Sequence, residues 1–134
     1  MLKRKILLAV FVMLTVFTYA QKSETFVVNP SKSLVKWAGK KIVGGNTEGT
    51  ILVSKGSLAF ANKNLKSGEI VMDATSISSE KASPRLVAHL KNPDFFDVEK
   101  FPTASFTITS VKTDKNVAQI SGKMTIKGIT KDLA

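Results

Sequence analysis

Few side chains in this sequence could carry out chemistry. The 134 residues contain one histidine, His89, and no cysteine. The missing cysteines exclude a thiol nucleophile, a thiolate-ligated zinc or iron–sulfur site, a disulfide framework and a lipid-modified cysteine. A single histidine also excludes a histidine-rich metal site within the chain.

The acidic residues Asp94, Asp97 and Glu99 form the densest group of carboxylates. Paired carboxylates can act as general acid and base, and clustered ones can hold calcium. Their spacing lacks the regular oxygen-ligand pattern of an EF-hand loop. Helix capping and surface solvation are the simpler interpretation, and we predict no metal site.

A nucleophile activated by His89 is the other conceivable chemistry. His89 could act as a general base for Ser83 or Ser79, but the sequence lacks a G-x-S-x-G elbow. Gly44-Gly45 is not followed by a lysine and a hydroxyl residue, so it indicates a turn and not a phosphate loop. We predict no enzyme activity and no cofactor, and we expect His89 to pack a short helix against the rest of the domain. Contact with the head group of a ligand is the alternative.

Residues 1–20 have the organisation of a secretory signal peptide. A basic start (residues 3–5) precedes an apolar run of twelve residues (6–17), and Ala20 stands before Gln21. We predict cleavage between Ala20 and Gln21 and export to the periplasm or the exterior. An uncleaved membrane anchor is the alternative, but twelve apolar residues fall short of the ~20 that a bilayer core needs.

The basic charge of the chain is dispersed. The formal net charge of +10 falls to about +7 without residues 1–20, because three of the 20 basic side chains lie there while all 10 acidic ones remain. The remaining lysines occur singly or in pairs, and Arg85 is the only arginine beyond residue 20. Nucleic-acid sites concentrate arginine and interleave aromatic residues, so we predict no nucleic-acid partner. Weak contact with an anionic membrane surface stays open.

The elements that must position any site are short strands. Apolar and polar residues alternate along most of the chain from residue 33, which is typical of antiparallel sheet with one dry face. We therefore predict an all-β fold, a barrel or sandwich. Expected strands cover residues 33–43, 48–54, 57–61, 68–76, 104–109 and 119–127, with turns at 44–46, 55–56 and 62–64.

A long connection over residues 77–101 interrupts this pattern. Ser83-Pro84 is typical of a helix N-cap followed by proline at the first helical position, and Asn92-Pro93 repeats the signature. The spacing predicts one or two short helices. Such a connection often covers one end of a barrel. Its expected lid or mouth residues are His89, Phe95, Phe96 and Phe101.

The segment from His89 to Phe106, with the sequence HLKNPDFFDVEKFPTASF, closely resembles the signature of the YceI-like proteins, a family of exported lipocalin-like barrels. The resemblance extends to VKW (35–37), EGT (48–50), GSL (56–58) and ISGKMTIKGITK (120–131). It covers essentially all of residues 21–134. It implies an antiparallel β-barrel whose apolar lumen holds the isoprenoid chain of a polyprenyl or quinone-like lipid.

Inward-facing apolar residues are the candidates for lining such a lumen. They look the same in sequence whether they touch a ligand or only pack a core. We give most weight to Trp37, Met72 and Phe106, because large or flexible side chains shape a pocket most strongly. The full set of candidates is Val35, Trp37, Leu52, Ile70, Met72, Phe106, Ile108, Met124 and Ile126.

Two departures from the family pattern matter. Thr47 stands where relatives often have a histidine. The family domain also continues beyond residues 128–131 with further strands, so we predict a partial YceI-like barrel over residues 21–134 that is incomplete at its C-terminus. About six strands cannot close an eight-stranded barrel. We favour a fragment, and closure by a partner strand is the alternative.

Two functions follow from these observations. The first is an exported carrier or reservoir for an isoprenoid or quinone-like lipid, without covalent chemistry. The second is an exported structural or stress-associated interaction module of the same fold that holds no lipid. The sequence leaves the oligomeric state open.

Overall fold

The computed structural model describes residues 21–40 and 45–134, and within them the chain forms one antiparallel sheet. The predicted signal peptide and part of the predicted 33–43 strand and 44–46 turn lie outside the described residues. The elements are β1 (Ser23–Val27), the 3-10 turn η1 (Pro30–Lys32), β2 (Leu34–Lys40), β3 (Asn46–Ala61), β4 (Asn64–Ser78), α1 (Pro84–Lys91), β5 (Thr103–Asp114), β6 (Val117–Ile126) and β7 (Ile129–Leu133).

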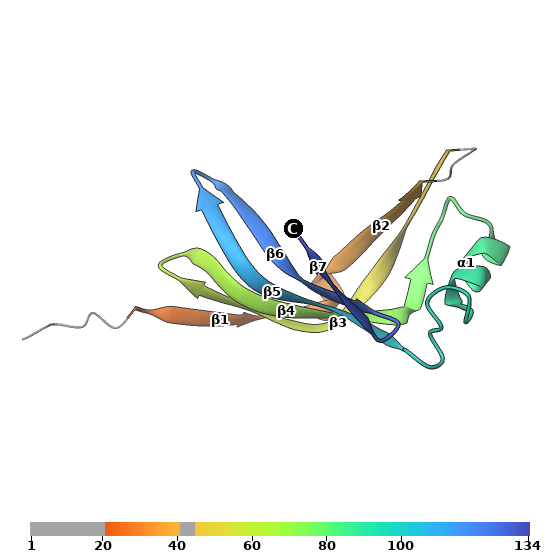
Figure 1. The fold of residues 1–134 in the computed structure, drawn as a ribbon, viewed down its shortest axis with the longest axis horizontal. Coiled ribbons are helices and arrows are strands. Elements are labelled where there is room, and N and C mark those ends of the chain that lie inside the picture. Colours follow the sequence, from red (N-terminus) through yellow and green to blue (C-terminus); the bar gives the residue numbers. More distant parts are fainter. Residues whose placement is uncertain (1–20, 41–44) are drawn as a thin grey trace, which may run out of the picture.

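The sheet curves like a trough and stays open in the described part of the chain. The strand order is β1-β3-β4-β5-β6-β7, and β2 pairs with β3 along the same edge as β1. In Figure 1, β2 rises on one side of the trough while β5 and β6 rise on the other. The fold is therefore an incomplete antiparallel barrel, as the sequence predicted.

Strand register divides the sheet into two chemically different faces. Residues directly opposite each other in an antiparallel pair point to the same face. The pairs Val53↔Met72 and Met72↔Ala104 thus place these three side chains together, and each is almost completely buried. Because curvature crowds side chains on the concave side of a single sheet, we take this as the inner face. Its apolar members are Val35, Trp37, Ile51, Val53, Leu58, Ile70, Met72, Ala104, Phe106, Ile108, Met124 and Ile126.

The outer face is mostly polar. Register places Lys36, Thr50, Glu69, Thr107 and Lys123 on it. The apolar and polar residues predicted to alternate in β4, β5 and β6 do separate onto the two faces. Hydrophobic periodicity of two residues therefore assigns the faces of these three strands.

The turn predicted at Lys55-Gly56 is wrong. β3 runs unbroken from Asn46 to Ala61, and Lys55 and Gly56 pair with Val71 and Ile70 of β4 beside a bulge. Gly56 allows the backbones of β3 and β4 to approach closely, because a Cβ there would lie 2.8 Å from the carbonyl oxygen of Glu69. β1 and η1 were not predicted.

The turn predicted at residues 62–64 is present as a two-residue hairpin loop. Asn62 and Lys63 have φ values of 50° and 64°, and the flanking residues Ala61 and Asn64 pair with each other. Positive φ at both loop positions is typical of a type I′ turn, which favours Asn-Gly. Lys63 therefore adopts a conformation that L-residues disfavour by roughly 1–2 kcal/mol.

Lys63→Gly is expected to raise the free energy of unfolding by about 0.5 kcal/mol, since relief of the left-handed strain outweighs the added entropy of the unfolded chain. Urea unfolding monitored by circular dichroism measures the change. The matched control is Lys66→Gly, an exposed lysine inside β4, where glycine should destabilise. Equal effects of both substitutions would contradict this account of the turn.

The connection between β4 and β5 holds the one described α-helix. Ser83 caps α1, with its hydroxyl accepting from the N–H of Leu86 at 3.2 Å, and Pro84 takes the first helical position as predicted. The second cap-and-proline signature, Asn92-Pro93, does not begin a helix. The chain forms turns there, in which the carbonyl of Asn92 accepts from the N–H groups of Phe95 and Asp97. In the described ranges, no helix has the length and hydropathy needed to cross a membrane.

Candidate functional site

The inner face brings together eight of the nine predicted lining residues. Register places Val35 and Trp37 of β2, Ile70 and Met72 of β4, Phe106 and Ile108 of β5, and Met124 and Ile126 of β6 on this face. They come from four strands far apart in sequence. The inner face is thus a continuous apolar wall.

Leu52 does not belong to this wall. It pairs with Leu34 of β2 and Asp73 of β4 on the outer face, and 54% of its surface is exposed. Alternation along β3 places its neighbours Ile51 and Val53 on the inner face instead. The sequence reasoning missed Ile51 and Val53, although both follow from the same period-two pattern.

An apolar cavity lies where β1, β2, β3 and β4 meet. It has a volume of about 330 Å³ and is lined in part by Val35, Val53, Leu58 and Ile70. Beside it, the rings of Phe26 and Phe60 meet edge to face with centroids 5.6 Å apart. The cavity is also lined by Val27 and Leu34 of the outer face, so it opens at the junction of β1 and β2.

Two glycines position the aromatic rings of this face. A Cβ on Gly49 would lie 2.6 Å from two atoms of the Trp37 ring and 1.9 Å from the carbonyl oxygen of Ser78. A Cβ on Gly122 would lie 2.5 Å from the Phe106 ring. Only glycine allows these rings to lie against the neighbouring strand, so both rings are held in one orientation.

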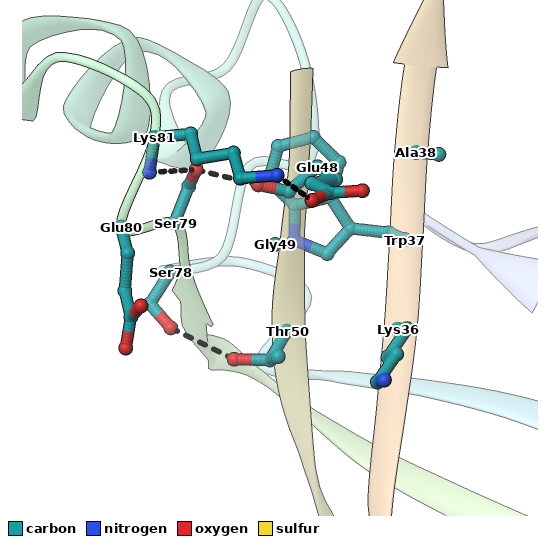
Figure 2. A pocket seen from close by; sticks show the side chains of 10 residues that line it. All are labelled: Lys36, Trp37, Ala38, Glu48, Gly49, Thr50, Ser78, Ser79, Glu80 and Lys81. Carbon is teal, nitrogen blue, oxygen red and sulfur yellow. Dashed lines mark hydrogen bonds and ion pairs between the residues drawn. The ribbon is translucent and has the colours of Figure 1, made fainter. Parts of the chain in front are cut away.

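A second, more polar cleft adjoins Trp37 near the β2–β3 hairpin. It has a volume of about 410 Å³ and lies between β2, β3 and the chain that follows β4. Figure 2 shows the indole of Trp37 passing behind β3 toward that chain. The lining residues are Lys36, Trp37, Ala38, Glu48, Gly49, Thr50, Ser78, Ser79, Glu80 and Lys81.

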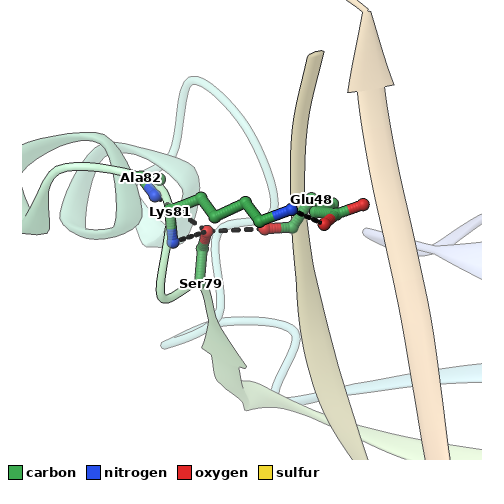
Figure 3. Close-up of polar contacts among 4 residues, drawn as sticks. All are labelled: Glu48, Ser79, Lys81 and Ala82. Atoms are coloured by element: carbon green, nitrogen blue, oxygen red, sulfur yellow. Dashed lines mark hydrogen bonds and ion pairs between the residues drawn. The ribbon is translucent and has the colours of Figure 1, made fainter.

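Hydrogen bonds from Ser79 fix the shape of this cleft. Its hydroxyl donates to the carbonyl oxygen of Glu48 at 2.6 Å and accepts from the N–H groups of Lys81 and Ala82 at 3.2 and 2.9 Å (Figure 3). The side chain of Lys81 also pairs with the carboxylate of Glu48. The Ser79 hydroxyl thus ties the chain after β4 to the backbone of β3.

Trp37 has an unusual polar group. Its indole Nε1–H is buried and has no hydrogen-bond partner within residues 21–40 and 45–134. A buried donor without an acceptor carries a desolvation cost of roughly 1–3 kcal/mol. Trp37 is the only tryptophan of the chain, so its fluorescence reports directly on this position.

The ion pair controls the titration of both partners. The hydrogen bond and the charge of Lys81 lower the pKa of Glu48 below its usual value, and the same contact raises the pKa of Lys81. A lowered carboxyl pKa contributes stability above the unfolded-state value, which is lost as pH falls through the folded-state value. Both groups are solvent-exposed, so the effect on stability is small.

Lys81→Met is expected to raise the pKa of Glu48 toward its usual value, because the substitution removes both the hydrogen bond and the charge. NMR titration of the side-chain carboxyl carbons measures this shift. Lys123→Met, which removes a lysine paired with Asp132 in place of Glu48, is the matched control and should leave the Glu48 midpoint unchanged. An unchanged Glu48 midpoint in Lys81→Met would show that the pair does not form in solution.

The predicted lid residues occupy two different places. The rings of His89 and Phe95 meet edge to face at 4.9 Å, and both side chains are exposed. His89 therefore contacts its own connection, which corrects the expectation that it packs the helix against the sheet. Phe96 is half-buried beside α1, with its N–H bonded to the carbonyl of Leu90.

Phe101 links the connection to the far end of the sheet. A Cβ on Gly128, in the β6–β7 turn, would lie 2.9 Å from the Phe101 ring. Lys127 in the same turn donates to the carbonyl oxygen of Pro93. These two contacts fasten the connection to the β6–β7 turn.

The acidic residues of segment 94–99 lie in the turns that follow α1. In the part of the chain that the structure describes, no three histidine, aspartate or glutamate side chains lie close enough to share an ion. Asp97 instead has a φ of 48°, and its carbonyl accepts from the N–H groups of Lys100 and Phe101. These carboxylates belong to a turn.

Comparison with known proteins identifies relatives over the same residues. A family model described as the YceI-like domain matches residues 26–134. Protein YceI of Escherichia coli O157:H7 and that of Salmonella newport are each 32% identical over 83 residues, which cover 62% of this chain and 44% of the relative. The matched region thus spans less than half the length of these curated relatives.

A solved structure shares the fold. BcnA of Burkholderia cenocepacia superposes with a TM-score of 0.67 at 24% sequence identity, covering 79% of this chain and 67% of that one. At this level of identity the likeness concerns the fold alone. It agrees with the open antiparallel sheet described above.

Proposed function

The chain belongs to the YceI-like family, a family of binding proteins, and from this premise we propose that it holds the isoprenoid chain of a polyprenyl or quinone-like lipid on its inner face. The observation that carries the proposal is the absence of charge on that face. Register puts Glu24 of β1 and Lys131 of β7 on the inner side at the two edges. From β2 to β6, the paired inner-face positions carry no charged side chain.

An uncharged apolar trough suits a long hydrocarbon chain. Each CH₂-sized unit moved from water to such a surface contributes about 0.8 kcal/mol, and the chain needs no charged partner along its length. The cavity beside Val35 and Ile70 offers unfilled space for part of it. Closure of the trough into a lumen, by further strands of a longer chain or by a partner strand, is part of this proposal.

The cleft beside Trp37 suits the polar end of the same ligand. Trp37 belongs both to the inner face and to the cleft lining, so the two sites adjoin. Two lysines and two glutamates line the cleft, Lys36 and Lys81 against Glu48 and Glu80. Because these charges balance, a neutral head group with oxygen acceptors fits better than a diphosphate.

The proposal is a non-covalent one. The candidate nucleophile Ser79 is engaged in structural hydrogen bonds, and the family relationship is to binding proteins. The basic and apolar pattern of residues 1–20 supports export, so we place the protein in the periplasm or outside the cell.

Solvent extraction of the purified protein tests this function. The chain is expressed with residues 1–20 in a bacterium that makes isoprenoid quinones, purified without detergent, extracted and assayed by mass spectrometry. We expect one isoprenoid lipid per protein chain. A folded protein that carries no isoprenoid would favour the alternative, an exported interaction module without a lipid ligand.

A further inference from the structure

The segment that leads from β4 to the cap of α1 is held by side chains alone. This strap, residues 79–82, contains no helix or strand. Its backbone groups make no hydrogen bond to the backbone of any other residue in the described ranges. Both of its polar contacts with the sheet end on Glu48 of β3, where the hydroxyl of Ser79 meets the carbonyl oxygen and Lys81 meets the carboxylate. So few contacts are typical of a segment that moves at low cost.

Open space lies on both sides of the strap. The cleft beside Trp37, of about 410 Å³, lies between the strap and strands β2 and β3. A hollow of about 440 Å³ lies between the strap and α1, where Val87 and Lys91 of the helix contribute to its lining. The strap therefore has room to shift toward α1, and such a shift widens the cleft.

Hydrogen bonds within the strap make it a compact unit. The Ser79 hydroxyl accepts from the N–H groups of Lys81 and Ala82 as well as donating to β3. The side chain of Lys81 extends from this turn across to the carboxylate of Glu48 (Figure 3). Lys81 and Ser79 are thus the two polar connections between the turn and the sheet.

Lys81 is the only charged side chain that ties the strap to the sheet in the part of the chain that the structure describes. Lys36 also acts on Glu48 through its charge, but it belongs to β2, which pairs with β3 in any case. Glu80, the other charged residue of the strap, forms no ion pair within the described residues. The side chains of Lys81 and Glu48 are 70% and 57% exposed, so their pair opens at low cost.

We propose that the Lys81–Glu48 pair is a latch, which holds the strap over the cleft and sets the rate at which the polar end of a ligand enters and leaves. This inference rests on the proposed function, which assigns the cleft to the head group of a lipid. Opening of a covering segment commonly limits how fast a ligand is exchanged. An exposed ion pair shifts such an opening equilibrium by about 1.4- to 5-fold, so the latch slows exchange without blocking it.

Acrylamide quenching of Trp37 tests the latch without any lipid. Trp37 is the only tryptophan and lines the cleft. In protein refolded from urea without lipid, Lys81→Met should raise the quenching constant about threefold. Lys123→Met is the matched control: it breaks the exposed pair with Asp132 and should leave the constant unchanged. At about 1 M salt the wild type should approach Lys81→Met, because salt screens the pair.

Charge reversal separates a latch from a packing effect of the lysine side chain. Lys81→Glu sets a second carboxylate against Glu48 and should raise the quenching constant further than Lys81→Met does. Adding Glu48→Lys to Lys81→Glu should lower the constant again by about twofold, although Lys36 disfavours another lysine nearby. Absence of this recovery would overturn the proposal.

Exchange of radiolabelled geranylgeraniol tests the latch with a ligand. Because an open strap speeds entry and exit alike, Lys81→Met should raise the association rate and the dissociation rate together, each by about threefold. Lys123→Met should change neither rate. Faster dissociation with an unchanged association rate would overturn the proposal, since Lys81 would then act as a contact of the bound head group.

Failure of the latch differs from failure of the proposed function. If geranylgeraniol binds and the rates and the quenching constant are the same in wild type and Lys81→Met, the latch is disproved and the carrier function stands. If no variant binds geranylgeraniol while quenching rises in Lys81→Met and recovers on charge reversal, the carrier function fails and the latch over the cleft stands.

Discussion

Gly49→Ala is expected to lower the free energy of unfolding by about 3 kcal/mol, at the upper end of the typical cost of overpacking. The added methyl group would meet the carbonyl oxygen of Ser78 at 1.9 Å and the Trp37 ring at 2.6 Å. Neither neighbour can move freely, since the Ser78 oxygen belongs to the backbone and the Trp37 ring packs directly against the glycine. β3 and the end of β4 must therefore separate.

Tryptophan fluorescence during urea unfolding measures this effect, because Trp37 is both the only tryptophan and the displaced ring. Its emission in the folded variant should shift to longer wavelength as the indole gains solvent. Gly39→Ala is the matched control. The nearest atom to its new methyl group is the carbonyl oxygen of Thr47 at 3.9 Å, so the change should stay within about 0.5 kcal/mol. Similar losses for both variants would refute the packing of Trp37 against Gly49.

Ile70→Lys is expected to reduce the isoprenoid content of the purified protein at least tenfold. Ile70 lies on the inner face and lines the apolar cavity, and a lysine there would put a charge where the hydrocarbon chain should lie. The measurement is isoprenoid per folded chain, by solvent extraction and mass spectrometry.

Val71→Lys is the control for Ile70→Lys. Val71 is the next residue of β4, is also half-buried, and faces the outer side opposite Lys55. Its isoprenoid content should stay within twofold of the wild type. Circular dichroism of both variants confirms that the sheet is retained. A loss of lipid from Val71→Lys as large as that from Ile70→Lys would show that binding does not depend on the inner face.

Local pattern was enough to predict the face of most of these residues. Phe106 and Met124 alternate with polar residues, and period-two spacing puts Ile70 and Met72 on one face with Val71 on the other. Ser83-Pro84 likewise predicts the start of α1, because a cap and a proline act within a few residues. The residues that carry the strongest resemblance to the family are also close together in sequence, in the segment 89–106.

Features that depend on pairing partners could not be predicted. Lys55-Gly56 has the composition of a turn, yet β4 lies alongside it and the glycine accommodates the backbone of that strand. The bulge between Val53 and Lys55 also shifts the alternation by one residue, so unbroken alternation from Leu58 would place Leu52 on the inner face. The contact of Trp37 with Gly49 likewise joins residues of two strands whose register the sequence alone does not state.

The cleft beside Trp37 could not be predicted from the sequence either. Ser79 and Lys81 follow β4, while Glu48 lies more than thirty residues earlier in β3. Nothing in the residue types links them, since the contact exists only because β3 and β4 are neighbours. The pair Leu34 and Leu52 on the outer face is similar, because these residues become neighbours through the β2–β3 register.

Photo-crosslinking tests most directly that the inner face holds an isoprenoid chain. A geranylgeranyl alcohol carrying a diazirine at its far end is bound to the purified chain, irradiated, and the labelled residues are mapped by mass spectrometry. The account predicts labelling on the inner face, and unlabelled geranylgeraniol should reduce it. The expected labelled residues are among Ile70, Met72, Phe106, Ile108 and Met124. Labelling concentrated at outer-face residues such as Leu34 and Leu52, or spread over both faces without competition, would contradict it.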